Sequence, residues 1–108
     1  MEAKDLRIGN WVCGMMTGNF QVEKTDFATF EAINCWGIPL SPEILIACGF
    51  NNSMGSKFWD YDRWFALEVE DNHFLYDLFR NKQVEIYYLH QLQNLYFALT
   101  NTELTIKL

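Results

Sequence analysis

Hydrophobic and polar residues alternate over several short stretches of the chain, which is the pattern of half-buried β-strands. The alternation runs over residues 6–13 and again over residues 20–24, on either side of the turn-forming stretch 17–19. This arrangement predicts an N-terminal β-hairpin or the opening strands of a small SH3-like barrel. Residues 26–35 fit a helix as well as a strand, because their apolar spacing is helical while their composition suits either state.

The second half of the chain contains further strand patterns. In residues 64–70, the side chains of Phe65, Leu67 and Val69 share one face of a strand, and polar residues alternate with them. Shorter patterns occupy residues 57–59, 73–79 and 84–86, with turn signals at residues 60–62, 71–72 and 81–82. Together these stretches predict an antiparallel meander of three or four strands.

A short helix is predicted over residues 42–48. Ser41 is a good N-cap residue, and Pro42 suits the first helical position because its missing N–H needs no partner there. Glu43 places a negative charge in the first turn, and Gly49 suits the left-handed position after the helix.

A longer helix is predicted over residues 87–100. The apolar positions there follow the spacing of one helical face, and they are Tyr88, Leu92, Leu95, Tyr96 and Leu99. Asn101 suits the end of this helix, because asparagine tolerates the left-handed conformation. The expected fold is therefore a single α+β domain over residues 1–108, with this helix packed on the sheet.

Composition places the chain among intracellular globular proteins. It has 108 residues and a net charge of −6, with scattered basic residues that do not predict a nucleic-acid surface. Three cysteines, an odd number, indicate free thiols in a reducing cytoplasm. The polar start and the short apolar runs predict neither a signal peptide nor a membrane span.

The sequence contains no recognisable catalytic grouping. It lacks a phosphate-binding glycine loop, and its two histidines, His73 and His90, lie on different predicted elements. Asp60 and Asp62 begin like a calcium loop, but Trp64 and Phe65 follow where an oxygen ligand and a glycine are required. We therefore expect a protein that is not an enzyme and that holds no metal or cofactor.

The C-terminal helix lacks formal charge, since no Asp, Glu, Lys or Arg lies between Glu85 and Glu103. A surface helix ordinarily carries charge on its solvent face. Opposite the apolar stripe lies a neutral face made of His90, Asn94, Phe97 and Asn101, with Gln91 and Gln93 beside it. Either this face is buried within the protein, its amides bonded to nearby backbone, or it is a partner surface that desolvates at low cost.

Residues 88–100 resemble the C-terminal signature of a group of short hypothetical proteins from gut Bacteroidetes and their phages and mobile elements. Residues 6–12 and 38–50 are similar to the same group. The chain departs from the usual pattern at Asn101, where such proteins commonly have glycine. The resemblance implies a bacterial or phage source and a cytosolic location, and it implies no activity.

These features lead to one main hypothesis and two alternatives. The main hypothesis is a binding or adaptor protein that uses its C-terminal helix or its sheet face to associate with another protein or with a second copy of itself. One alternative is single-stranded nucleic-acid binding through an aromatic β face, which requires positive charge that the chain lacks. The other is a small-molecule pocket between sheet and helix, lined by Trp59, Trp64, Tyr76 and His90.

Overall fold

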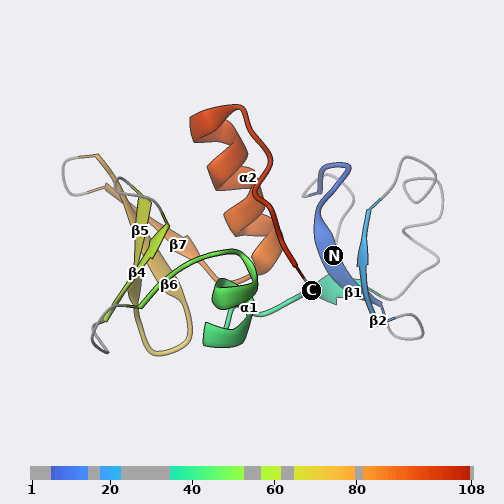
Figure 1. Ribbon diagram of the computed structural model, residues 1–108, viewed down its shortest axis with the longest axis horizontal. Coiled ribbons are helices and arrows are strands. Elements are labelled where there is room, and N and C mark those ends of the chain that lie inside the picture. Colours follow the sequence, from blue (N-terminus) through green and yellow to red (C-terminus); the bar gives the residue numbers. More distant parts are fainter. Residues whose placement is uncertain are drawn as a thin grey trace. The chain divides into compact units, whose positions relative to one another are not determined.

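Two antiparallel sheets and two helices make up the described part of the computed structural model, which confirms the predicted α+β class (Figure 1). The structure describes residues 6–14, 18–22, 35–52, 57–61, 65–79 and 82–107. The chain forms two compact units, which are described separately. The first unit contains Met1–Pro39 and Tyr88–Glu103, and the second contains Leu40–Tyr87 and Leu104–Leu108.

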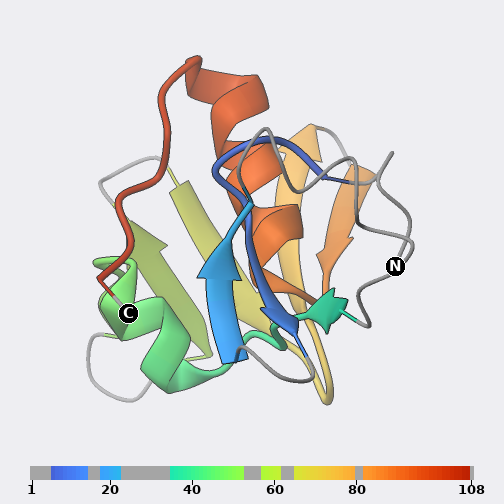
Figure 2. The same ribbon diagram turned by 90° about the vertical axis from the view of Figure 1, so that its right-hand side faces the viewer.

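The first unit contains a three-stranded sheet with the order β2-β1-β3. Its strands are β1 (Trp11–Gly14), β2 (Gly18–Gln21) and β3 (Cys35–Gly37). The predicted hairpin is formed by β1 and β2, and β3 pairs with the other side of β1 (Figure 2). Gly18 pairs with Gly14, so Gly18 and Asn19 are strand residues rather than the predicted turn. Most of the ambiguous stretch 26–35 lies outside the described residues, and Cys35 begins β3.

The predicted strand over residues 6–13 is wrong in its first half, where the backbone forms a turn. Gly9 has a φ of +95°, a conformation that favours glycine. The Asn10 side chain fixes this turn, because its Oδ1 accepts a hydrogen bond of 2.6 Å from the backbone N–H of Arg7. We call residues 7–11 the N-terminal turn. Beside it, Leu6, Val12 and Val22 form a small buried core.

Helix α2 (Leu89–Thr100) also belongs to the first unit and packs on β1. It begins two residues later than predicted, because Tyr88 is an extended N-cap. The Gln91 side chain compensates for the poor cap by accepting a 3.1 Å hydrogen bond from the backbone N–H of Tyr88. The helix ends as predicted at Asn101, whose φ is 57°.

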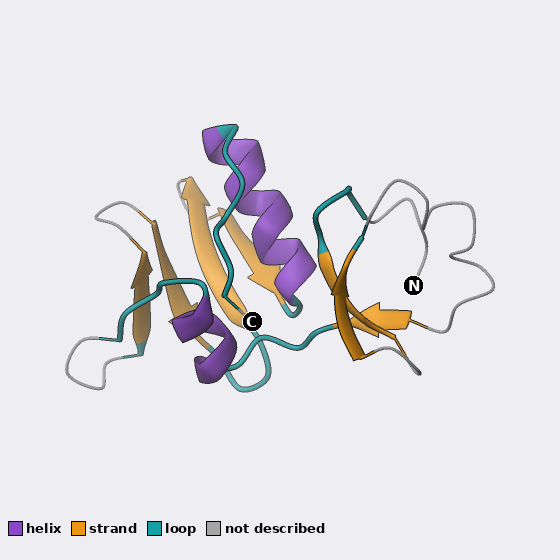
Figure 3. Ribbon diagram, turned by 45° about the vertical axis from the view of Figure 1, so that its right-hand side comes forward, coloured by secondary structure: helices purple, strands orange, loops and turns teal. Residues whose placement is uncertain are grey.

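The second unit contains the predicted meander as a four-stranded sheet with the order β4-β5-β6-β7 (Figure 3). Its strands are β4 (Phe58–Tyr61), β5 (Phe65–Val69), β6 (Phe74–Phe79) and β7 (Lys82–Ile86). Two predicted turns are therefore shorter than expected, since Asp60 and Tyr61 extend β4 and Lys82 begins β7. One face of this sheet is buried through Phe65, Leu67, Phe74, Tyr76 and Ile86.

Helix α1 (Pro42–Ala47) follows its predicted capping pattern. The Ser41 hydroxyl accepts a hydrogen bond from the backbone N–H of Ile44, and Gly49 has a φ of +90°. The N–H groups of Gly49 and Phe50 bond back to the carbonyls of Ile46 and Leu45, which is a Schellman ending. The Phe50 ring then packs against Tyr61 and Phe65 on the buried face of the sheet.

Candidate functional site

The neutral face of α2 contacts the N-terminal turn of its own unit. The side chain of Gln93, which is 1% exposed, forms hydrogen bonds to the backbone of that turn through both the oxygen and the nitrogen of its amide. Its Oε1 accepts a 2.7 Å hydrogen bond from the backbone N–H of Trp11, and its Nε2 donates one of 3.0 Å to the carbonyl of Gly9. The amides of this face therefore satisfy backbone groups, as expected for buried polar side chains.

Asn94 joins the same network through a single oxygen. Its Oδ1 accepts a hydrogen bond of 2.7 Å from Arg7 Nε and another of 2.9 Å from Asn10 Nδ2. Asn10 is fully buried, so this bond satisfies a donor that has no access to water. The helix and the N-terminal turn, more than 80 residues apart in sequence, are thus linked by side-chain amides.

Arg7 places a positive charge beside the uncharged helix α2. Its guanidinium lies 4.4 Å from the centre of the Phe97 ring, and Nη1 donates a 2.6 Å bond to Glu103 just beyond the helix. A further donor, Nη2, lies 3.3 Å from the carbonyl of Gln93. The role of Arg7 was not predicted, because a single arginine in a predicted strand gives no indication of its partner.

The other predicted residues of the neutral face have separate surroundings. His90 is buried, and its ring stacks on that of Tyr88 with 5.8 Å between centroids. Gln91 caps the start of the helix, and the exposed Asn101 ends it. The structure therefore groups Gln93, Asn94 and Phe97 into one contact, and leaves His90, Gln91 and Asn101 outside it.

A second candidate surface is the exposed side of the four-stranded sheet, which we call the outer face. Residues opposite one another in an antiparallel pair share a face. The register therefore places two rows of side chains on this side, one of Phe58, Glu68, Leu75 and Glu85 and the other of Asp60, Ala66, Asp77 and Gln83. Each of the eight is exposed or half-buried.

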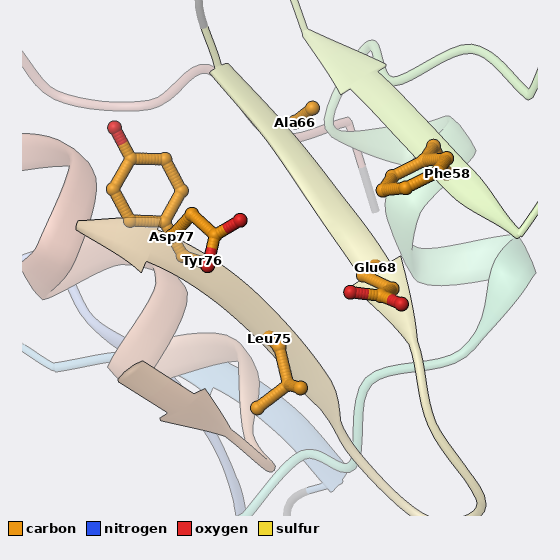
Figure 4. Close-up of a pocket in the computed structure, with 6 residues that line it drawn as sticks. All are labelled: Phe58, Ala66, Glu68, Leu75, Tyr76 and Asp77. Atoms are coloured by element: carbon orange, nitrogen blue, oxygen red, sulfur yellow. The ribbon is translucent and has the colours of Figure 1, made fainter. Parts of the chain in front are cut away.

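A small hollow lined by both polar and apolar side chains lies on this side of the sheet. It has a volume of about 150 Å³ and is lined by Phe58, Ala66, Glu68, Leu75, Tyr76 and Asp77. Figure 4 shows Glu68 on the middle strand between Phe58 and Leu75. Phe58 is 42% exposed, so a large aromatic side chain meets solvent on this side of the sheet. Its position at the start of β4 was predicted, but its exposure was not, because alternation alone does not show which face is buried.

The outer face is acidic. Of its eight residues, Asp60, Glu68, Asp77 and Glu85 are carboxylates, and none is basic. Lys57, next to β4, places its Nζ 3.0 Å from Glu68 Oε1 and 5.5 Å from the centre of the Phe58 ring. One lysine of the chain thus already contacts both the acidic and the aromatic component of this face.

Among the described residues, no three metal-ligating side chains come together. Of the residues proposed to line a small-molecule pocket, Trp64 lies outside the described part of the chain. Tyr76 is 9% exposed and stacks on Phe65 at 4.6 Å between ring centres.

The buried Cys48 thiol is held in its protonated form. Burial raises its pKa from 9.0 to about 12, because the thiolate would be desolvated. The folded protein thus retains a proton that the unfolded chain releases at lower pH. The contribution that the protonated Cys48 makes to the stability of the folded state is fully present below about pH 9 and is lost as the pH rises through about 12.

We therefore expect Cys48 to resist alkylation in the native protein. Iodoacetamide at mildly alkaline pH should modify the half-buried Cys13 before Cys48, since the thiolate is the reacting form. Peptide mass spectrometry after timed labelling measures both rates, and labelling in urea gives the control in which burial is removed. Equal native rates for the two cysteines would contradict the described burial.

Comparison of the chain with protein-family models, with curated proteins and with solved structures gave no match. Neither helix of the described residues has the length and apolar character needed to cross a bilayer.

Proposed function

We propose that this protein is a non-enzymatic binding protein that recognises a partner protein through the outer face of its four-stranded sheet. The observation that supports this proposal best is the exposed Phe58 at the edge of a small hollow that the carboxylates of Glu68 and Asp77 also line. Interface centres combine exposed aromatic anchors with a polar rim. The neutral face of α2 is less suited to the task, because Gln93, Asn94 and Phe97 already contact the N-terminal turn.

The acidity of the outer face also favours a protein partner over nucleic acid. Binding to a phosphate backbone depends on lysine and arginine side chains that replace its counterions. The outer face carries Asp60, Glu68, Asp77 and Glu85 instead, so it would repel a nucleic-acid strand. We place the protein in the cytoplasm of a bacterial cell, a proposal supported by the free thiols of Cys13 and Cys48.

The test is a matched pair of surface substitutions. Phe58→Ser removes the aromatic anchor of the outer face, and Ile46→Ser removes an apolar side chain of similar size that is 63% exposed on α1. Tagged parent and variant proteins are used to capture partners from the native host, and the recovered partner is then titrated against each. We expect Phe58→Ser to weaken binding roughly tenfold or more, as at an interface anchor, and Ile46→Ser to leave it unchanged.

Unfolding midpoints of all three proteins show whether each remains folded. Phe58 is 42% exposed and Ile46 is 63% exposed, so we expect the free energy of unfolding to fall by about 1–2 kcal/mol for Phe58→Ser and by less than about 1 kcal/mol for Ile46→Ser. A partner that binds the Phe58→Ser protein as tightly as the parent would contradict the proposed site.

A further inference from the structure

We infer that the segment bound by the outer face is basic, presenting lysine or arginine side chains to its carboxylates. This inference rests on the proposed function and names the chemistry of the partner. Four of the eight residues of the face are acidic and none is basic. A second copy of the chain would place acid against acid and has a net charge of −6, so charge complementarity selects a different, basic protein.

Lys57 shows where such a cation is held. Its ammonium lies 3.0 Å from the Glu68 carboxylate and 5.5 Å from the centre of the Phe58 ring, while its side chain remains 65% exposed. A carboxylate beside an aromatic face is a favourable environment for a cation. The chain's own lysine therefore occupies a subsite that a lysine or arginine of the partner would also fit.

The remaining acids provide further contacts. Among the described residues, the Lys57–Glu68 ion pair is the one that reaches the outer face, and both Asp60 and Asp77 are exposed on it. Side chains on one sheet face stand about 5 Å apart across strands and about 7 Å apart along them. That spacing suits several separate cationic side chains along one segment, and the hollow formed by Phe58, Ala66 and Leu75 suits their aliphatic stems.

The experiment is an NMR titration of the full chain with a short oligolysine peptide and, separately, with an oligoglutamate of the same length. We expect the oligolysine alone to shift the amide signals of β4, β5 and β6, and added salt to suppress the effect. The Asp77→Asn variant should bind oligolysine about two- to fivefold more weakly. Glu43→Gln, a neutralisation on α1, is the matched control and should not change binding.

The affinity of the Lys57→Ala variant for oligolysine distinguishes a binding role of these acids from a purely structural one. Removing this lysine frees Glu68 and removes a repulsive charge, so oligolysine should bind more tightly than to the parent. Weaker binding to Lys57→Ala, or equal binding of the two peptides, would overturn the inference. If Phe58→Ser abolishes binding of the host partner but that partner has no basic segment, the inference of a basic partner is wrong and the proposed function of the sheet face stands. If Phe58→Ser does not change binding of that partner, the proposed function itself is wrong.

Discussion

Replacing Asn94 by alanine is expected to lower the free energy of unfolding by about 2–3 kcal/mol, because it leaves a buried donor without its acceptor. Asn94 Oδ1 accepts hydrogen bonds from both Arg7 Nε and Asn10 Nδ2. Asn10 is fully buried, so water cannot replace the lost bond. The Arg7–Glu103 ion pair contributes little by comparison, since Glu103 is half exposed.

Urea unfolding of the variant measures this loss. Asn94→Asp is the matched control, because it keeps an acceptor oxygen and adds a charge that attracts the Arg7 guanidinium. We expect it to retain most of the parent stability. A double-mutant cycle with Arg7→Met then measures how much of the lost stability comes from the interaction between Arg7 and Asn94. If Asn94→Ala were as stable as the parent, the contact between α2 and the N-terminal turn would not stabilise the fold.

The second large effect is expected at Gly37, where β3 passes close to the ring of Tyr88. A Cβ at this position would lie 2.6 Å from Tyr88 Cγ, 2.8 Å from Cδ1 and 2.9 Å from Cβ. The Tyr88 Cβ cannot move without the backbone, and Cγ and Cδ1 move only if the side chain leaves its rotamer. Gly37→Ala should therefore cost roughly 2–3 kcal/mol, the typical effect of overpacking.

The same substitution in a Tyr88→Ala background tests the cause. Removing the ring eliminates the two shortest contacts and leaves only the one at 2.9 Å. The cost of Gly37→Ala should therefore fall to about half or less of its value in the parent protein, a coupling that thermal or urea unfolding resolves. An equal cost in both backgrounds would show that the clash with Tyr88 is not the reason that glycine is required.

Elements with strong local signals were predicted well. Ser41, Pro42 and Gly49 give α1 its cap, its first residue and its ending, and all three act within one or two turns of the helix. Asn101 ends α2 for the same local reason. The second sheet was also predicted, because turn signals and alternation are short-range features.

Predictions that depend on long-range contacts were less accurate. The alternating pattern of residues 6–13 indicated a strand, but Gly9 and Asn10 form a turn whose partner is on α2. The absence of charge from α2 is evident from its sequence. Only the structure shows that Arg7 and the N-terminal turn contact that helix, since no periodicity links residues so far apart.

The most direct test of this account compares Phe58 on the outer face with Phe97 on the neutral face of α2. Each is replaced in turn by the photoreactive benzoylphenylalanine, and the protein is irradiated with the partner recovered from its host. We expect the protein labelled at position 58 to crosslink to the partner and the protein labelled at position 97 not to. Crosslinking at position 97 without crosslinking at position 58 would contradict the proposed binding site.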